Sequence, residues 1–219
     1  METPTHNNDP RREVATRHTA WAMGTARLLA RAGLRPNTIS AMSVVFAAAA
    51  GACLALSPRG AGWHGPALLV GAILAMQLRL LCNLFDGMVA VECGFKTRSG
   101  AIFNDLPDRL ADPTILIGAG YAAQAVPFGV ELGWVAALLA VLTAYVRVLG
   151  GASGARQYFL GPMAKQHRMA VMTVAALAAA VAHRYAAPIL ASALAVVAVG
   201  CAITVGRRVI AAVRELEAG

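Results

Sequence analysis

The stretch "NLFDGMVAVECGFKTRSGAIFNDLPDRLAD", residues 83–112, places four aspartates in a chain that otherwise avoids charge. Charged residues make up 14% of the 219 residues, hydrophobic residues make up 58%, and the mean hydropathy is +0.61. Soluble domains carry roughly 25% charged residues, so this composition indicates an integral membrane protein. The aspartates are unusual there, because a carboxylate inside a bilayer costs roughly 2.5 to 3.5 kcal/mol on insertion scales.

Apolar stretches long enough to cross a bilayer recur along the chain. A spanning helix needs about 20 apolar residues. Six stretches approach this length: 38–56, 66–90, 100–123, 128–149, 169–183 and 188–205. The sequence therefore predicts an all-α integral membrane protein, with six transmembrane helices in one domain over residues 36–219.

The N-terminal part is polar and basic. We expect residues 1–12 to be disordered and no signal peptide to be removed, because no cleavable apolar segment opens the chain. Residues 13–35 place Trp21, Leu28 and Ala32 on one helical face among several arginines. This pattern predicts an amphipathic helix that lies in the membrane interface before the first span. A plain basic cytoplasmic helix is the alternative.

The distribution of Lys and Arg predicts the orientation, because these residues are retained in cytoplasmic loops. With the N-terminus inside, the segments on the outer side hold only Arg59 and Arg184. The inner segments hold Arg11, Arg12, Arg17, Arg27, Arg31, Arg35, Lys96, Arg98, Arg156, Lys165, Arg168, Arg207, Arg208 and Arg214. We therefore expect the N-terminus and the polar cluster to face the cytoplasm, in a bacterial inner membrane. The net charge of +8 favours anionic membrane lipid and requires no nucleic-acid partner.

The polar cluster lies where the second and third predicted spans form an antiparallel hairpin. Asn83 and Asp86 are spaced i,i+3, and Asn104 and Asp108 are spaced i,i+4, so each pair shares one helical face. Oxygen ligands suit hard cations such as Mg²⁺, Mn²⁺ or Ca²⁺ and do not suit zinc. The spacing predicts a divalent-cation site at the cytoplasmic surface.

The same stretch resembles the signature of the CDP-alcohol phosphotransferase family, D-x2-D-G-x2-A-R-x8-G-x3-D-x3-D. The matching positions are Asn83, Asp86, Gly87, Ala90, Val91, Gly100, Asn104 and Asp108. Six spans, an interfacial helix and "PNTIS" before the first span also fit, so the resemblance covers nearly the whole chain. It implies that residues 36–219 form a catalytic domain, that the metal is Mg²⁺ or Mn²⁺, and that the protein is a homodimer.

Three positions depart from the signature. Asn83 and Asn104 replace two aspartates, and Val91 replaces the arginine. The resemblance implies that Asn83, Asp86 and Asn104 bind the metal, and that Asp108 acts as the general base within the same site. Because Asn is uncharged, we expect weaker metal binding. Alternatively, a fixed cationic side chain supplies the positive charge that a weakly bound metal does not, and Arg79 is the candidate.

The implied reaction transfers a substituted phosphoryl group from a CDP-linked donor to an alcohol and releases CMP, in phospholipid synthesis. We expect Arg79, Gly87, Ala90 and Gly100 to bind the CDP moiety. For Arg79, the alternative is a structural ion pair with Asp86 or Asp112. Arg147, Lys165 and Arg168 are the candidates for the phosphate of the donor or of a phosphorylated acceptor, with the positive-inside pattern alone as the competing explanation. Asp105 and Asp112 are expected to be supporting residues.

The sequence is also compatible with other functions. Within the family, the donor is CDP-diacylglycerol by our main hypothesis and a soluble CDP-choline or CDP-ethanolamine type by the alternative. The two Asn residues also suit a catalytically silent member. An ion-coupled transporter is the hypothesis from a different class, but the carboxylates gather at one membrane face and no later span repeats them.

Overall fold

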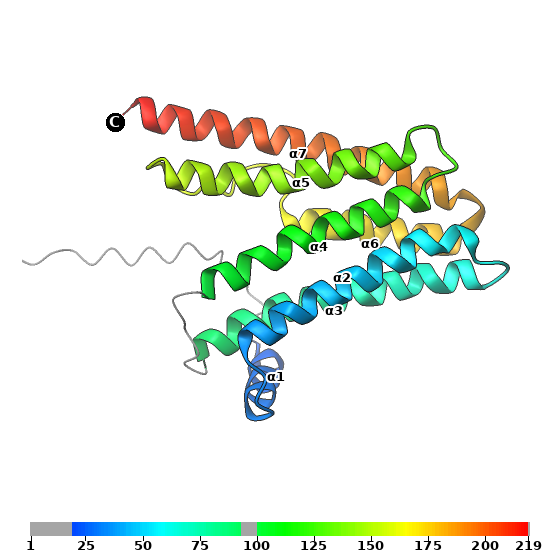
Figure 1. Cartoon of the computed structure of the whole chain (residues 1–219), viewed down its shortest axis with the longest axis horizontal. Coiled ribbons are helices and arrows are strands. Elements are labelled where there is room, and N and C mark those ends of the chain that lie inside the picture. The colour runs from blue at the N-terminus through cyan, green and yellow to red at the C-terminus, as the bar shows by residue number, and fades with distance from the viewer. Residues whose placement is uncertain (1–18, 93–99, 219) are drawn as a thin grey trace, which may run out of the picture.

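The described residues, 19–92 and 100–218 of a computed structural model, are almost entirely helical (Figure 1). The helices are α1 (Ala20–Arg31), α2 (Pro36–Leu56), α3 (His64–Glu92), α4 (Gly100–Ala122), α5 (Gly129–Ala152), α6 (Lys165–Val181) and α7 (Ala186–Glu217). Short 3-10 turns follow α2 at Ser57–Arg59 and α6 at His183–Tyr185. Pro36 begins α2, where its fixed φ suits the first helical position and its missing N–H costs nothing.

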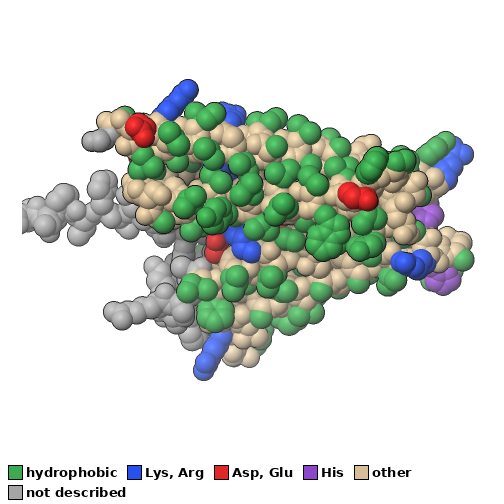
Figure 2. Space-filling view, turned by 45° about the horizontal axis from the view of Figure 1, so that its top comes forward, with side chains coloured by type: hydrophobic (Ala, Val, Ile, Leu, Met, Phe, Trp, Pro, Cys, Tyr) green, Lys and Arg blue, Asp and Glu red, His purple; other side chains and the backbone are tan. Residues whose placement is uncertain are grey.

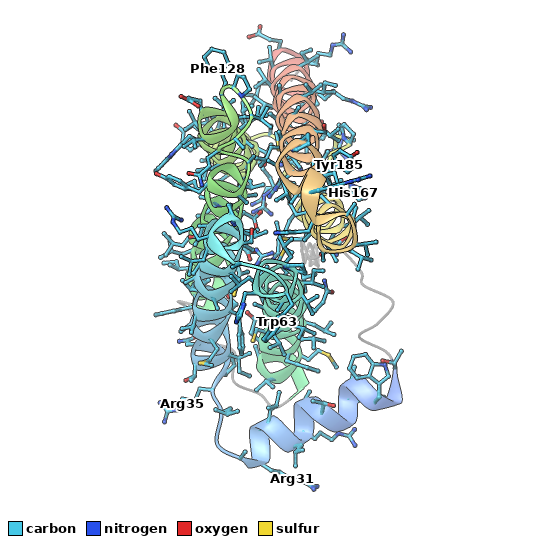
Figure 3. The ribbon with its side chains drawn as sticks, turned by 90° about the vertical axis from the view of Figure 1, so that its right-hand side faces the viewer. Arg31, Arg35, Trp63, Phe128, His167 and Tyr185 are labelled. Carbon is cyan, nitrogen blue, oxygen red and sulfur yellow. The ribbon has the colours of Figure 1, made fainter. Side chains whose placement is uncertain are left out.

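The helices α2 to α7 run along a common direction, and α1 lies crosswise to them (Figures 1 and 3). Helix α2 packs on α3 and α4, α4 packs on α5, and α5 packs on α7. Helix α6 closes the bundle between α3 and α7. It starts partway along the bundle in Figure 1, so its first turn lies at depth between the longer helices.

Helix α1 packs its small residues against the end of α3. Ala22 and Ala26 are fully buried in a cluster with Phe85 and Val89, and Trp21 meets Phe85 edge to face. The described residues thus include a helix within the predicted range 13–35, although it begins at Ala20. Residues 1–18 and the predicted polar turn at 93–99 lie outside the described residues.

Among the described residues, the segments long and apolar enough to cross a membrane are four: Pro36–Arg59, His64–Ala90, Gly129–Ala152 and His183–Glu217. Helix α4 is long enough but carries Asp105, Asp108, Arg109 and Asp112, and α6 has only 17 residues. Hydrophobic side chains cover most of the visible flank of the bundle in Figure 2, and charged ones are sparse there.

The last two predicted spans differ from the helices. Helix α6 begins at Lys165 rather than at residue 169, and α7 continues to Glu217 rather than ending at residue 205. Hydropathy alone ends a span at its charged residues. Here those residues stay helical because Arg168 and Arg208 are buried and find partners inside the bundle.

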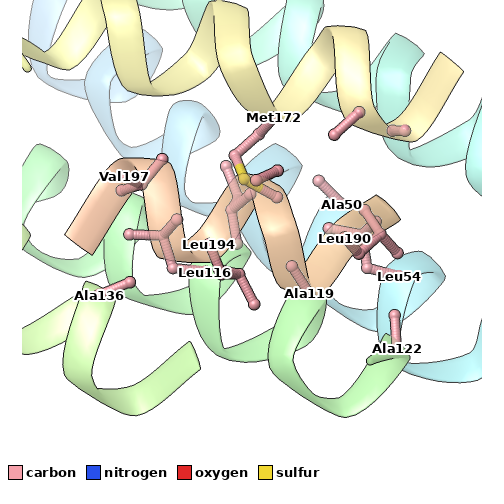
Figure 4. Close-up of a cluster of buried hydrophobic side chains, with 14 of the residues drawn as sticks. Ala50, Leu54, Leu116, Ala119, Ala122, Ala136, Met172, Leu190, Leu194 and Val197 are labelled. Carbon is pink, nitrogen blue, oxygen red and sulfur yellow. The ribbon is translucent and has the colours of Figure 1, made fainter. Parts of the chain in front are cut away.

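Small residues let the helix backbones approach closely. The apolar core consists largely of Ala with Leu and Met side chains from α2, α4, α5, α6 and α7, as Figure 4 shows. A Cβ added at Gly118 would lie 2.3 Å from the carbonyl oxygen of Gly51 on α2, and one added at Gly133 would lie 2.7 Å from Cα of Gly120. Since lipid tails are as apolar as these side chains, close packing is the main attraction available between the helices.

An ion triad lies buried between α3, α4 and α6. Asp112 accepts from Arg79 Nη2 at 2.5 Å with one oxygen, and from Arg168 Nε at 3.1 Å and Nη2 at 2.5 Å with the other. Arg79 is 0% exposed, Arg168 is 3% exposed and Asp112 is 2% exposed. Each helix therefore contributes one charge, and the carboxylate of Asp112 on α4 pairs with the guanidinium groups of both α3 and α6.

We expect Gly118→Ala to loosen the contact between α2 and α4. Overpacking of this kind costs about 1 to 3 kcal/mol, so the variant should melt at a lower temperature in detergent, followed by tryptophan fluorescence. Gly206→Ala is the matched control, because a Cβ at Gly206 meets nothing within 4 Å. Equal melting temperatures for the two variants would contradict the close packing described here.

We expect Asp112→Asn to destabilise the protein strongly, because it leaves the buried guanidinium of Arg168 without a carboxylate partner and Arg79 with Asp108 alone. Breaking a buried ion pair from one side costs about 3 to 5 kcal/mol. Asp105→Asn is the control: its side chain is 38% exposed, and loss of its pairs should cost about 1 kcal/mol or less. Thermal unfolding of both variants in the same detergent tests this ranking, and a smaller loss for Asp112→Asn would refute it.

Candidate active site

The candidate site starts from one stripe of polar residues on α3. Arg79, Asn83 and Asp86 follow one another at spacings of four and three residues, so they lie on the same face. Arg79 and Asp86 are buried and Asn83 is half-buried. On α4, Asp105, Asp108 and Asp112 share one face in the same way, and Asp108 and Asp112 contact Arg79 of this stripe.

Asp108, on α4, contacts residues of both α3 and α6. One of its carboxylate oxygens, Oδ1, accepts from Arg79 Nη2 at 3.0 Å. The other, Oδ2, lies 2.5 Å from Nζ of Lys165, in the first turn of α6. Both oxygens of the predicted general base therefore have a cationic partner.

Asp86 is held differently. Its Oδ2 accepts from the hydroxyl of Ser40 on α2 at 2.7 Å, and its Oδ1 is buried without a partner. The charges of Lys165 and Asp108 lie within electrostatic range of this carboxylate. Asp86 thus has one buried oxygen that is free for a ligand.

Unpartnered polar atoms gather on the α3 stripe. Among the described residues, five buried side-chain nitrogen or oxygen atoms lack a hydrogen-bond partner, and four of them are Arg79 Nε, Arg79 Nη1, Asn83 Nδ2 and Asp86 Oδ1. Buried polar groups are nearly always hydrogen-bonded, and exceptions concentrate where a ligand or ion binds. The stripe offers a ligand three donor atoms and one acceptor atom.

The α3 stripe offers little to a divalent cation beyond Asp86. The free oxygen of Asp86 suits one hard cation. The unpartnered atom of Asn83, one turn away, is its amide nitrogen, which is a hydrogen-bond donor. Asp108 has no oxygen free of a cationic partner, and the described residues contain no group of three or more His, Cys, Asp or Glu placed to hold a metal. Asn104 lies in α4, but its side chain is outside those described. The described side chains fit a single ion at Asp86.

A second group of cations lies beside this site. Arg147 on α5 and Arg109 on α4 both donate to Oδ1 of Asp105, at 2.9 and 2.7 Å, and the Arg147 guanidinium lies 5.1 Å from the ring centroid of Phe159. Arg208 on α7 is within electrostatic range of both arginines and of Arg168. Its described partners are the backbone carbonyls of Leu160, at 2.9 Å, and of Thr143.

The charges of the site do not balance. Six cationic side chains (Arg79, Arg109, Arg147, Lys165, Arg168 and Arg208) face four carboxylates (Asp86, Asp105, Asp108 and Asp112). The described part of the site therefore has a surplus of two positive charges. Such a surplus at a membrane surface favours anionic ligands.

The cations predicted to bind substrate are all paired with carboxylates in the structure. Lys165 contacts Asp108, Arg168 contacts Asp112 and Arg147 contacts Asp105, so each cation predicted to bind phosphate has a carboxylate partner. Arg79 makes ion pairs and also keeps two free donor atoms. Gly87 and Ala90 continue α3 beyond Asp86, and Gly100 begins α4.

Two contributors were missed from sequence. Ser40 touches Asp86 although 46 residues separate them, and nothing in "PNTIS" itself indicates that contact. Arg208 was counted only as an inner positive charge. Its signal was present, because helix-compatible residues continue past it without Pro until the end of α7.

No protein-family model matches the chain. A phosphatidylinositol phosphate synthase of Mycolicibacterium smegmatis is 32% identical over 137 residues, which amount to 60% of this chain and 56% of the relative. The match thus spans a little over half the length of that relative.

Two solved structures of the phosphatidylinositol phosphate synthase of Mycobacterium tuberculosis are similar in fold. The structure with CDP-DAG bound gives a TM-score of 0.72 at 23% identity, over 87% of this chain and 92% of that chain. The structure in complex with manganese and citrate gives 0.73 at 20% identity, over 87% and 88%. With its four apolar spans, the chain is an integral membrane protein that is homologous to phosphatidylinositol phosphate synthase over part of its length and has the fold of that enzyme.

Proposed function

We propose that this chain is a member of the CDP-alcohol phosphotransferase family that transfers a phosphatidyl group from CDP-diacylglycerol to an alcohol and releases CMP. The observation behind this proposal is the stripe of buried, unpartnered polar atoms on Arg79, Asn83 and Asp86. These residues occupy or adjoin the family signature, and the similar M. tuberculosis enzyme was solved with CDP-DAG bound.

The CDP moiety is assigned to the α3 stripe and the start of α4. Arg79 Nε and Nη1 are the free donors for its phosphate oxygens, and guanidinium is well suited to phosphate. Gly87, Ala90 and Gly100 add little side-chain bulk, so the nucleotide can approach the two helices. The acyl chains of the donor remain in the bilayer.

The metal, Mg²⁺ or Mn²⁺, is assigned to the signature residues around Asp86, and Asp108, whose oxygens pair with Arg79 and Lys165, acts as the base rather than as a ligand. Asp86 supplies the free carboxylate oxygen, and the manganese in a structure of the M. tuberculosis enzyme supports this choice of ion. When bound, a divalent cation supplies positive charge that offsets the charge building on the CMP leaving group.

The transfer forms a bond between the acceptor oxygen and the phosphorus of the lipid phosphate, and it breaks the bond from that phosphorus to CMP. Asp108 accepts the proton of the attacking hydroxyl. In the structure Lys165 occupies Oδ2 of Asp108, so its ammonium must move away before this oxygen can accept a proton. Arg79 keeps the carboxylate oriented meanwhile.

The acceptor is assigned to the arginine-rich side of the site, and we propose that it carries a phosphate. Arg147 and Arg168 are the predicted phosphate-binding residues on this side, and Arg208 adds a buried charge without a carboxylate partner among the described residues. Lys165, the third predicted phosphate-binding residue, contacts Asp108 and is assigned to the donor phosphates. The surplus of two positive charges supports an anionic acceptor in addition to the anionic donor. The name of the M. smegmatis relative also specifies a phosphorylated product.

In the membrane, we propose that α4 and α6 cross together with the four apolar helices, giving six spans. The charges of α4 are compatible with this placement because Asp108 and Asp112 are paired inside the bundle. Helix α1 then lies in the inner interface, with the N-terminus and the site facing the cytoplasm of a bacterial inner membrane. The proposed assembly is a homodimer.

A catalytically silent member is the second candidate. It is favoured by the two Asn residues at signature positions and by the cation on each oxygen of Asp108. Such a protein would bind the CDP-linked lipid without releasing CMP.

A CMP-release assay on purified protein in lipid tests the main proposal. Wild type should release CMP from CDP-diacylglycerol in the presence of Mg²⁺ or Mn²⁺ and a phosphorylated alcohol, and chelation of the metal should abolish release. Asp108→Asn and Asp86→Asn should each lower kcat by about 100-fold or more, because one removes the base and the other the free metal ligand. CDP-choline with diacylglycerol is offered in parallel.

The outcomes separate the candidates. If the protein binds the CDP-linked lipid but releases no CMP with any alcohol offered as acceptor, the main proposal is wrong and the chain is a catalytically silent member. Equal CMP release by wild type and both variants would refute the site assignment. Release from CDP-choline alone would replace the lipid donor by the soluble one.

We expect Arg147→Gln to raise KM for a phosphorylated acceptor by about tenfold or more, since a charge-assisted hydrogen bond is lost. KM for CDP-diacylglycerol should change much less. Arg59→Gln is the control, because Arg59 is exposed at the opposite end of α2. Steady-state kinetics with each substrate varied in turn provides the measurement, and an unchanged acceptor KM would remove Arg147 from the acceptor site.

A further inference from the structure

The ion pairs of Asp108 leave neither of its oxygens free, so a second divalent cation beside one at Asp86 would lack this carboxylate as a ligand. Each such ion needs several oxygen ligands, with carboxylates supplying the negative charge. Here Arg79 and Lys165 already neutralise Asp108, and Arg79 and Arg168 neutralise Asp112. Asp86 Oδ1 is the carboxylate oxygen of the described α3 stripe that has no partner.

The sequence changes at the signature agree with this charge balance. Replacing two aspartates by Asn83 and Asn104 removes two negative charges. The site then needs two fewer positive charges for balance, which is the charge of one divalent cation. Two cationic side chains, Arg79 and Lys165, stand beside the remaining carboxylates of the site.

We propose that the ammonium of Lys165, together with the guanidinium of Arg79, takes the place of one divalent cation, so that this chain binds a single Mg²⁺ or Mn²⁺, at Asp86. This inference rests on the proposed function and specifies how its site handles the charge of the donor pyrophosphate. Arg79 is the fixed partner, because it is fully buried and its Nη2 bridges Asp108 and Asp112. Its free Nε and Nη1 donate to the donor phosphates.

Lys165 is the mobile partner. Its side chain is 29% exposed and stands in the first turn of α6, and an ammonium on a flexible stem can change partners without moving the backbone. When the pyrophosphate arrives, Nζ moves from Asp108 to a phosphate oxygen. The same movement frees Oδ2 of Asp108 for the proton of the acceptor hydroxyl.

Counting bound Mn²⁺ tests the inference directly. Free Mn²⁺ is followed by electron paramagnetic resonance during titration of the purified chain in lipid nanodiscs. Wild type should bind one Mn²⁺ per chain. The triple variant Asn83→Asp, Asn104→Asp, Lys165→Met restores the acidic pattern and removes the ammonium, and it should bind two. Any wild-type stoichiometry other than one overturns the inference.

Nucleotide binding without metal gives a second readout. CDP, used as a soluble probe in excess EDTA, should bind wild type and Lys165→Arg within about threefold of each other. Lys165→Met should bind it at least about tenfold more weakly, because a charge-assisted hydrogen bond to phosphate is lost. This variant should still fold, since Arg79 remains on Asp108. Equal CDP affinity for Lys165→Met and wild type in EDTA overturns the inference.

Arg207→Met is the matched control for this experiment, because Arg207 is an exposed cation of α7 outside the site. Its CDP affinity should equal that of wild type. The two proposals fail separately. A chain that binds one Mn²⁺ and metal-free CDP but releases no CMP would keep this inference and lose the proposed function, whereas CMP release with two bound Mn²⁺ would do the reverse.

Discussion

The buried carboxylate of Asp112, held between Arg79 and Arg168, constrains the site described here. Two positive charges and one negative charge on three different helices are taken out of water, and Asp108 supplies the second negative charge through Arg79. These ion pairs hold α3, α4 and α6 in one relative register. Asp108 lies one helical turn from Asp112 on α4, and Lys165 lies about one turn from Arg168 on α6. The triad therefore also places the residues that meet at the candidate base.

Small residues make this arrangement possible. The contacts of Gly51 with Gly118 and of Gly120 with Gly133 bring α2, α4 and α5 together at backbone distance. Ser40 on α2 can then reach Asp86, and Arg147 on α5 can reach Asp105. Larger side chains at these crossings would separate the helices and with them the polar groups. The composition of the apolar core thus determines the geometry of the polar site.

The site has more positive than negative charge, and the surplus is arranged in two parts. Arg79 and Lys165 lie at the signature residues, where the nucleotide phosphates are proposed to bind. Arg147 and Arg208 lie on the side of α5 and α7, where a phosphorylated acceptor is proposed to bind. Two anionic substrates would thus meet near Asp108. An uncompensated surplus inside a helical bundle is costly, which is the physical reason to expect bound anions there.

Much of this protein follows from local properties of its sequence. The length of the apolar runs predicts membrane helices, and the periodicity of residues 83–112 puts Asn83 with Asp86 and Asn104 with Asp108 on single helical faces. The predicted bounds of the last two spans differ from those of α6 and α7, because hydropathy treats Lys165, Arg168 and Arg208 as ends of spans. Their partners lie elsewhere in the chain, so the cost of burying them could not be judged locally.

Tertiary structure decided which charges meet. Lys165 and Asp108 are 57 residues apart, and Ser40 and Asp86 are 46 apart. No spacing rule reaches across such separations, since helical periodicity fixes only the face on which a residue lies and not the helix that it meets. The sequence by itself determined the fold class and the position of the acidic cluster. Packing alone determined that a lysine and an arginine neutralise Asp108 while Asp86 keeps a free oxygen.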